Sequence, residues 1–582
     1  MWARHRLEWV TAVVAAVLGA AYLVLPRMGS DLAAQTARAE FFADHGYTPI
    51  DLRWYAGVDQ LGYSLLSQPV MALLGVRVTG ALSLVLASVL IAALFRRTGA
   101  PRPWLGALAG TVGVAGNLVS GRVTYGLGIA LALAALLLLT HPRWRWLAAV
   151  PALLASATSP VAGLFLGLAG VALLVTGRWA AGVLIAAPAA VPLGWSALFL
   201  GDGGWMNIST TDTLRAVVSS LAVALLVPRW PVRAGGVLSA LGVLAAAMVH
   251  TPVGLNATRL AVMFTLPLLA GYAALPRFVP ARPGRASAFP ARLTPAGHSP
   301  AHSSTGRHSP AEHSPAHSST GRHSPARPGL ATHLPPAPAA PADTGSARNR
   351  PLPVWGVALL LVVACWWQPP VVVGDVRDAG NPTAQRAYFA PLLARLSKEH
   401  LTGRVDIPST RDYWEAAYLG DVPLARGWLR QADIDRNPLF FSDIPGARGT
   451  GVALTPASYR AWLSSRAVQF VAVPDAELTW SGRPSAQLIN AGLPYLAPIW
   501  SNEHWRLYAV ADPQPIVPAP ATLVSQTATT LTFDVPAAAD LTVRVHHYSW
   551  LRASGGALVQ ASGEWTLIRL PAPGRYTLTS GF

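Results

Sequence analysis

The chain of 582 residues contains one cysteine, Cys365, and one lysine, Lys398. A single cysteine excludes disulfide bonds within the chain and gives no support for redox chemistry. Charged residues make up only 12% of the sequence, whereas a soluble domain usually carries about a quarter. The phosphate-binding, zinc-protease and nucleophile-elbow motifs of common enzymes are also absent. Much of the chain is therefore expected to lie in lipid.

Acidic residues are scarce as well, and the formal net charge is +17. The excess arginine lies beside apolar segments and in one proline-rich stretch, not in a stripe on a folded surface. This distribution suits membrane orientation and contact with anionic lipid headgroups. It does not have the pattern of a nucleic-acid-binding face.

Long apolar segments are abundant, and they predict a polytopic α-helical membrane protein. Basic residues alternate between the ends of these segments, beginning with Arg4 and Arg6 before the first. The positive-inside rule then places the N-terminus and every second loop in the cytoplasm, so an odd number of spans leaves the C-terminal region outside. The eleven expected spans are 9–26, 77–95, 103–119, 123–140, 145–158, 160–176, 179–200, 213–228, 234–250, 257–275 and 353–368. The fifth is short for a bilayer, and Ser159-Pro160 predicts either a tight hairpin or a broken helix between it and the sixth.

Composition divides the chain into five expected regions. A membrane domain covers 1–276, with ten spans and a first outer loop at 27–76, and an eleventh span follows at 352–369. Between them, 277–351 is rich in Pro, His, Ser and Arg, repeats HSPAHSSTGRHSPA twice, and predicts a disordered cytoplasmic loop. Its seven histidines suggest a duplicated spacer, with weak metal binding as the alternative.

The region after the last span has the mixed patterns of an extracytoplasmic soluble part. Residues 370–515 combine helical periodicity with short apolar strands, which predicts an α/β domain. From 516 to 582, strands of alternating polarity punctuated by Gly and Pro predict a small β-sandwich-like domain that leans on its neighbour.

Candidate chemistry is concentrated in the first outer loop. Asp31 follows the first span closely, where a carboxylate at the lipid surface can take a proton from an acceptor hydroxyl. The alternative is an ordinary solvated loop whose acidic residues keep it out of the membrane. The other candidate substrate-binding residues of this loop are Asp44, His45, Asp51, Arg53 and Asp59.

Two outer turns carry arginine against the positive-inside trend, and each arginine there needs a partner or a purpose. Asn117 and Arg122 lie between the third and fourth spans, and Arg259 opens the tenth. These side chains are candidates to bind a lipid phosphate through paired guanidinium hydrogen bonds; snorkelling to headgroups is the alternative. Three further polar residues of an outer loop are candidates to join Asp31: Asp202, Asn207 and Asp212.

The soluble part offers weaker signals. Asp433 and Asp435 form a D-x-D triplet, a pattern that occurs often by chance. Trp550 and Trp565 suit sugar stacking, but core packing in a β-domain is the favoured explanation for them.

The arrangement of a first helix, an outer loop opening with Asp31, further spans and an external C-terminal domain resembles the GT-C superfamily of polyprenyl-phosphate-sugar-dependent membrane glycosyltransferases. The helix and strand at Tyr459–Val473 look like the soluble domain of actinobacterial GT-C-like proteins. The resemblance implies inverting sugar transfer from a polyprenyl-phosphate donor to an envelope glycan, with Asp31 as base. The paired acidic residues common in that family are missing, because Ser30 precedes Asp31 and Leu32 follows it.

The resemblance implies no cofactor, although a divalent metal stays open. Two other classes also remain open: a non-catalytic scaffold that binds envelope components, and a lipid or solute transporter. No acidic residue lies deep within a span and the first five spans are not repeated in the next five, which weighs against transport.

Overall fold

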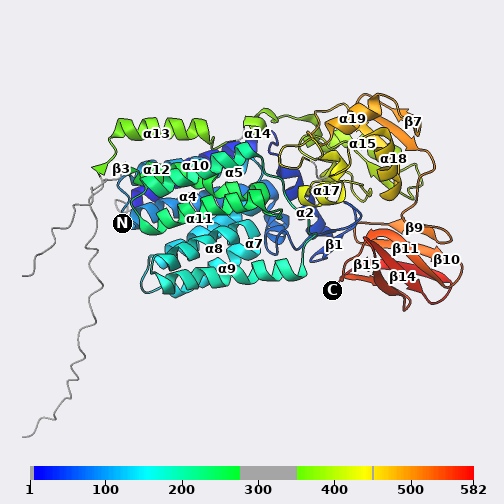
Figure 1. The fold of residues 1–582 in the computed structure, drawn as a ribbon, viewed down its shortest axis with the longest axis horizontal. Coiled ribbons are helices and arrows are strands. Elements are labelled where there is room, and N and C mark those ends of the chain that lie inside the picture. Colours follow the sequence, from blue (N-terminus) through cyan, green and yellow to red (C-terminus); the bar gives the residue numbers. More distant parts are fainter. Residues whose placement is uncertain (1–4, 276–349, 372, 449–450, 582) are drawn as a thin grey trace, which may run out of the picture. The chain divides into compact units, whose positions relative to one another are not determined.

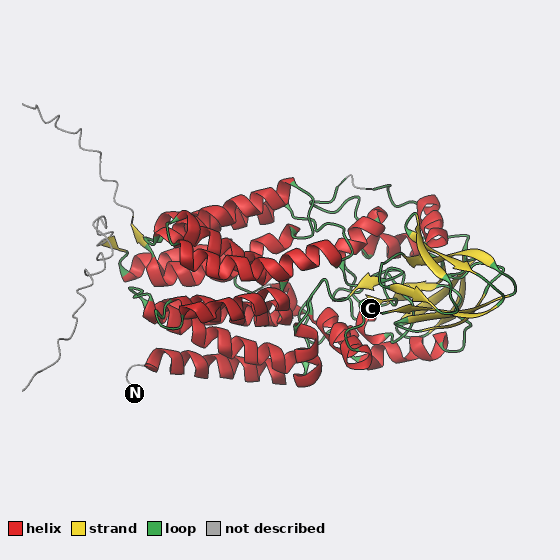
Figure 2. Ribbon diagram, turned by 90° about the horizontal axis from the view of Figure 1, so that it is seen from below, coloured by secondary structure: helices red, strands yellow, loops and turns green. Residues whose placement is uncertain are grey.

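The computed structural model describes residues 5–275, 350–371, 373–448 and 451–581. The predicted disordered loop at 277–351 lies almost wholly outside these residues. The described residues on the two sides of that loop form one compact unit, with apolar helices in one part and strands in the other (Figures 1 and 2).

Each predicted span coincides with a helix of the described chain. These helices are α1 (Arg6–Val24), α4 (Val76–Arg97), α5 (Pro103–Val119), α6 (Val123–Leu139), α7 (Ala149–Thr158), α8 (Pro160–Val175), α9 (Trp179–Phe199), α10 (Thr210–Leu226), α11 (Trp230–Met248), α12 (Arg259–Tyr272) and α13 (Val354–Trp367). Among the described residues, α1, α4, α9 and α11 are long and apolar enough to cross a membrane. The protein is thus a helical membrane protein, while the count of eleven spans is not confirmed.

The centre of the bundle is α4, which packs against α1, α5 and α6. Small residues allow the close approach that membrane helices need: a Cβ added to Gly19 of α1 would lie 3.3 Å from the Cβ of Ala81. The turn between α7 and α8 is tight, because Ser159 is extended and its hydroxyl accepts the amide of Ala162. Since Gly163 packs directly on Ser156, the chain forms the hairpin and not the broken helix.

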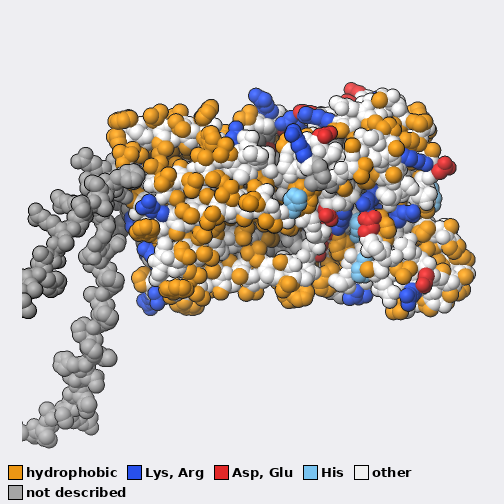
Figure 3. Space-filling model, in the orientation of Figure 1, with side chains coloured by type: hydrophobic (Ala, Val, Ile, Leu, Met, Phe, Trp, Pro, Cys, Tyr) orange, Lys and Arg blue, Asp and Glu red, His pale blue; other side chains and the backbone are white. Residues whose placement is uncertain are grey.

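Basic residues collect at one end of the bundle. Arg96 pairs with Glu8 near the start of α1, Arg97 donates to the Thr140 carbonyl at the end of α6, and Arg229 donates to the Thr98 carbonyl. Arginine side chains are visible at that end, whereas hydrophobic side chains cover most of the flank of the helices (Figure 3). Asp31, Arg122 and Arg259 occupy the opposite helix ends.

The loop after α1 is folded. It contains α2 (Leu32–His45), the two-stranded pair β1 (Ile50–Asp51) and β2 (Val58–Asp59), and α3 (Ser67–Leu74). Eight of the fourteen residues of α2 are buried, so this helix lies under other elements and is not a free surface helix.

The first part of the C-terminal region is a four-stranded sheet of order β5-β6-β8-β7 with helices on both faces. Side chains alternate along β6: Phe470 and Ala472 face the cluster that contains Phe389 of α15, while Val471 and Val473 face the cluster with α18 and α19. The elements are α14 (Val373–Arg377), α15 (Arg386–Leu396), β5 (Arg404–Asp406), α16 (Glu415–Tyr418), α17 (Arg430–Arg436), α18 (Pro456–Ser465), β6 (Val468–Pro474), α19 (Arg483–Asn490), β7 (Leu496–Ser501) and β8 (Trp505–Val510).

The last strands form two packed antiparallel sheets, β12-β15-β10-β9 and β11-β14-β13. Their shared core includes Phe533 and Leu578 from one sheet and Val543 and Ile568 from the other. The strands are β9 (Thr522–Gln526), β10 (Thr530–Val535), β11 (Ala539–His546), β12 (Leu551–Ala553), β13 (Leu558–Ser562), β14 (Trp565–Leu570) and β15 (Gly574–Ser580). The short pair β3 (Ala274–Leu275) and β4 (Arg350–Pro351) flanks the undescribed loop, and 3-10 turns occur at Arg145–Ala148, Gly254–Thr258, Pro382–Ala384 and Pro438–Phe440.

Candidate functional site

Asp31 lies at the N-terminal end of α2, with its carboxylate between two arginines. Arg122 immediately precedes α6 and Arg259 is the first residue of α12. The Asp31 Oδ2 is 3.3 Å from Nε of Arg122 and 3.3 Å from an Nη of Arg259. The three side chains keep 13%, 23% and 17% of their surface exposed, respectively. Two positive charges thus face one negative charge at a site that solvent still reaches.

Glycine brings the turns that carry these residues into backbone contact. Gly29 has φ +109°, and a Cβ there would lie 2.5 Å from the Val119 carbonyl oxygen. A Cβ at Gly121, where φ is +73°, would lie 2.5 Å from the amide nitrogen of Leu32. The Asp31 amide therefore reaches the Ser120 carbonyl at 3.2 Å. No other residue type fits at either position without moving one turn away from the other.

Asn117 belongs to the same group. Its side-chain amide donates to the Arg122 carbonyl at 3.1 Å, which closes the turn between α5 and α6. Asn117, Arg122, Arg259 and Asp31 therefore lie together, and the contact that Asn117 makes in this arrangement holds the Arg122 turn.

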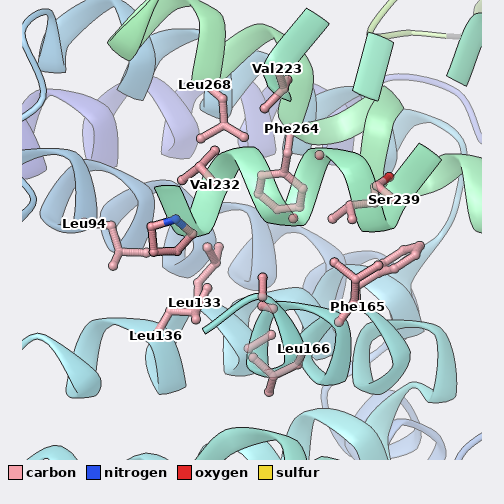
Figure 4. Close-up of a pocket in the computed structure, with 18 of the residues that line it drawn as sticks. Leu94, Leu133, Leu136, Phe165, Leu166, Val223, Val232, Ser239, Phe264 and Leu268 are labelled. Atoms are coloured by element: carbon pink, nitrogen blue, oxygen red, sulfur yellow. The ribbon is translucent and has the colours of Figure 1, made fainter. Parts of the chain in front are cut away.

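An apolar cavity of about 630 Å³ lies among α4, α6, α8, α11 and α12, and its lining reaches Thr98, Thr140 and Arg178 at the basic end of the bundle. Arg259 lies over the ring of Tyr125 at 5.4 Å, and Tyr125 packs edge-on against Phe165, which lines the cavity. Leu260, next to Arg259, lines it too. The volume is within the range of roughly 300–1,000 Å³ typical of ligand pockets. Other lining side chains surround the space in Figure 4: Leu94, Leu133, Leu136, Leu166, Val223, Val232, Ser239, Phe264 and Leu268.

Asp44 and His45 lie away from this centre. They are at the C-terminal end of α2, which places them roughly 20 Å along the helix from Asp31. Asp44 is exposed, and the His45 ring packs against Phe41 at 5.0 Å between centroids.

Asp51, Arg53 and Asp59 are engaged with other groups of the loop. Arg53 makes a bidentate ion pair with the buried Asp51, with its shorter contact at 2.8 Å. Asp59 accepts the Gly62 amide at 2.6 Å. Burial raises the pKa of Asp59 to about 6, opposed by the Gly62 hydrogen bond and reinforced by Asp202. The ion pair between Asp51 and Arg53 thus stabilises the conformation of the loop at 27–76.

The other outer-loop candidates do not gather around Asp31. Asp202 pairs with Arg436 at 3.2 Å, and the Asn207 side-chain amide donates to the Pro445 carbonyl. Asp212 accepts a hydrogen bond from the Ser209 hydroxyl at the start of α10. Asp433 of the D-x-D triplet is buried in an ion pair with Arg426 at 2.7 Å. Trp565 stacks on His546. Within the described ranges, no group of three or more His, Cys, Asp or Glu is arranged to hold a metal ion.

Four neighbours of the site were missed in the sequence. Gln35, one turn after Asp31 on α2, donates to the Tyr63 hydroxyl at 2.9 Å and accepts from Thr124 at 2.6 Å. Burial raises the pKa of Tyr63, and the charge of Asp31 raises it further, so that hydroxyl is within electrostatic reach of Asp31. Asp375 and Trp428 contact Ser30. The spacing of Asp31 and Gln35 was a usable signal, since both lie on one helix face.

These features define a class: a helical membrane protein with a strand-rich C-terminal region and a carboxylate–arginine site near one end of an apolar cavity. No family model matches the chain, and no curated protein matches it. Two cryo-EM structures of the arabinofuranosyltransferase AftD from mycobacteria, one of them a mutant, are similar to it with TM-scores of 0.41. Identity is 14% and 12%, over 99% of this chain and 57% and 60% of those chains, respectively. The chain thus spans less than two thirds of their length.

Proposed function

We propose that this protein is a GT-C-type membrane glycosyltransferase, which transfers a sugar from a polyprenyl-phosphate donor to a cell-envelope glycan with inversion. The observation that carries the proposal is the position of Arg122 and Arg259 around Asp31, with Leu260, the residue after Arg259, lining one end of the apolar cavity. An anionic head and a long apolar tail are the two chemical features that such a site fits.

The arginine pair is suited to the donor phosphate. The two guanidinium groups that face Asp31 outnumber that one carboxylate, so the Asp31–Arg122–Arg259 group carries a net positive charge for an incoming anion. The nearby Asp375 carboxylate offsets part of that charge. Both contacts to Asp31 are 3.3 Å, longer than the 2.7–2.9 Å typical of strong charge-assisted hydrogen bonds. A phosphate that binds both guanidinium groups therefore competes well with Asp31 and frees its carboxylate.

The cavity is suited to the isoprenoid tail. Its lining is mainly aliphatic and aromatic, and it includes Leu260, one residue after the arginine that would hold the phosphate. The polar members of the lining are Thr98, Thr140, Arg178, Ser220, Ser239 and Thr265. Burial of apolar chain there contributes about 25 cal/mol per Å². The tail thus provides affinity while the charged head sets the position of the reacting carbon.

Asp31 is the proposed base. It removes the proton of the acceptor hydroxyl as that oxygen forms a bond to the anomeric carbon from the face opposite the phosphate. The bond between the anomeric carbon and the phosphate oxygen breaks, and its electron pair leaves with the polyprenyl phosphate. Arg122 and Arg259 stabilise the charge that develops on that leaving group.

The orientation proposed for the chain places this chemistry outside the cytoplasm. The basic ends of the helices, with Arg96, Arg97 and Arg229, would face the cytoplasm, and the ends at Asp31 would face outward. The C-terminal region would be external and available to a glycan acceptor.

Transfer assays on membranes test the proposal. Wild-type, Asp31→Asn and Arg259→Lys proteins are incubated with labelled polyprenyl-phosphate sugars, and label is followed into larger glycans. We expect Asp31→Asn to lower the rate about 100-fold or more. Arg259→Lys should raise KM for the donor about tenfold, because an ammonium group cannot make a bidentate contact with phosphate.

Asp540→Asn is the matched control, since Asp540 also faces an arginine, at 3.8 Å, but lies on an exposed strand with 64% of its side chain accessible. It should transfer like wild type. Equal transfer by wild type and Asp31→Asn would refute the proposed base. No transfer by any folded variant would favour a scaffold or a transporter.

A further inference from the structure

Two side chains of the C-terminal region bind the backbone of Ser30, the residue before Asp31. The Ser30 amide donates to Oδ1 of Asp375 at 3.0 Å. The indole N–H of Trp428 donates to the Ser30 carbonyl at 3.2 Å. These partners are 345 and 398 residues away along the chain, and together they satisfy both polar backbone groups of one residue.

Asp375 also binds the turn that carries Arg122. Its second oxygen, Oδ2, accepts the Ser120 hydroxyl at 2.6 Å. Ser120 in turn accepts the Asp31 amide on its carbonyl. Ser120 and Asp375 are 1% and 3% exposed, respectively, so one buried carboxylate joins the two turns on which the proposed base and one arginine are carried.

Trp428 makes a second contact on the other side of the site. Its ring packs edge-on against Tyr63, with 5.9 Å between centroids. The Tyr63 hydroxyl accepts from Gln35, which lies in the first turns of α2. Trp428 therefore contacts both the residue before Asp31 and a ring hydrogen-bonded to the residue one turn after it.

We propose that Asp375 and Trp428 are positioning residues, which fix Ser30 and thereby the distance from the Asp31 carboxylate to Arg122. We call this contact the Ser30 clamp. The effect of the clamp on the rate of transfer rests on the proposed function, whereas its effect on the position of Ser30 does not. Hydrogen bonds donated to a carboxylate are strong. Loss of Asp375 leaves the Ser30 amide and the Ser120 hydroxyl without this acceptor. A displacement of Asp31 by about 1 Å is enough to slow a positioned reaction ~100-fold.

The variants separate the clamp from general destabilisation. Asp375→Ala removes both hydrogen bonds. Asp375→Asn keeps them, since its oxygen still accepts the Ser30 amide and its NH2 group can donate to the Ser120 hydroxyl. Trp428→Phe keeps the aromatic packing on Tyr63 and removes only the bond to the Ser30 carbonyl.

Two readouts are compared in the full-length protein: hydrogen–deuterium exchange of the segment 28–33, and steady-state transfer. We expect Asp375→Ala to speed exchange of this segment roughly tenfold or more, with recovery in Asp375→Asn. In the transfer assay kcat should fall about 100-fold while KM for the donor changes little. Trp428→Phe should have smaller effects of the same sign.

Asp378→Asn and Trp480→Phe are the controls. Asp378 lies three residues after Asp375 and pairs with Arg411, and Trp480 is 45% exposed. Neither substitution should change the exchange of segment 28–33. Unchanged exchange in Asp375→Ala overturns the clamp, whatever the activity. If Asp375→Ala speeds exchange but transfers sugar at the wild-type rate, the positioning role is overturned. If Asp375→Ala speeds exchange and Asp375→Asn restores the wild-type rate of exchange, the clamp is supported, even where no protein transfers sugar.

Discussion

We expect the carboxyl group of Glu415 to make the stability of this protein depend on pH near neutrality. Glu415 is 3% exposed on α16 and accepts hydrogen bonds from the amide and the hydroxyl of Thr410. Burial raises its pKa to about 7, against these hydrogen bonds, which lower it. The folded protein therefore holds a proton that the unfolded chain releases above about pH 4.5, and stability is lost as the pH rises from there through 7.

Replacement of Glu415 by Gln should remove that dependence. We expect equal melting temperatures for the variant and wild type near pH 5, and a higher melting temperature for the variant at pH 8, because no charge is then buried. Thermal unfolding in detergent from pH 5 to 8 measures this. Glu503→Gln, at an exposed position, should follow wild type throughout; a constant offset for Glu415→Gln would contradict the titration.

Single residues also show what sequence could and could not predict. Asp31, Arg122 and Arg259 were found because charged residues at the ends of apolar segments that were expected to face outward need a partner. The structure pairs Asp31 with both arginines. Asp375 and Trp428 carry no such signal: their contacts to Ser30 cross several hundred residues, and neither belongs to a periodic pattern or a motif. The roles assigned to the site residues remain predictions.

At the scale of elements, helices were predictable and the spaces between them were not. Runs such as α6 are apolar throughout, and Pro103 and Pro160 occupy first turns, where proline is favoured. The cavity arises where α4, α6, α8, α11 and α12 fail to fill the volume between them, which depends on crossing geometry and on small residues from separate helices. The pairing of the short strand β5 with β6 likewise depends on a partner more than 60 residues away in the chain.

Gly235 of α11 offers a way to fill this cavity. It lines the space, and a Cβ added there would meet only the Cβ of Ala172, at 3.9 Å. We expect Gly235→Leu to raise KM for long-chain lipid donors about tenfold and to affect short-chain analogues less. Gly242→Leu on the same helix, where a Cβ meets nothing within 4 Å, is the control. Equal KM values for both donors would show that the tail binds elsewhere.

On the scale of the whole molecule, the N-terminal loop and the C-terminal region are built as one body. The Leu52 amide donates to the Ala528 carbonyl at 2.7 Å, and Arg436 of α17 donates to the Gly57 carbonyl at 2.7 Å. Ile50 and Leu52 lie in the core of the two-sheet region. The region boundaries drawn from composition remain predictions, but these contacts show that the loop at 27–76 packs with the strands that end the chain.

The orientation of this body in the membrane can be tested with the lone cysteine removed. In a Cys365→Ser background, Asp540→Cys should react with a membrane-impermeant maleimide on intact cells. Arg143→Cys, in an exposed turn at the basic end of the bundle, should react only after permeabilisation. The reverse pattern would place the basic ends outside and overturn the proposed orientation.

The Ile50 amide donates a 2.8 Å hydrogen bond to the hydroxyl of Ser580, which lies 530 residues later in the chain. During synthesis, this contact can form only after Ser580 has been translated. At a synthesis rate of roughly 5–20 residues per second, about 25–100 s separate the emergence of its two ends from the ribosome. During that interval β1 can pair only with β2, and Ile50 and Leu52 have no core to enter. A newly made chain therefore depends on whatever protects this hairpin from aggregation or proteolysis until its last strands are translated.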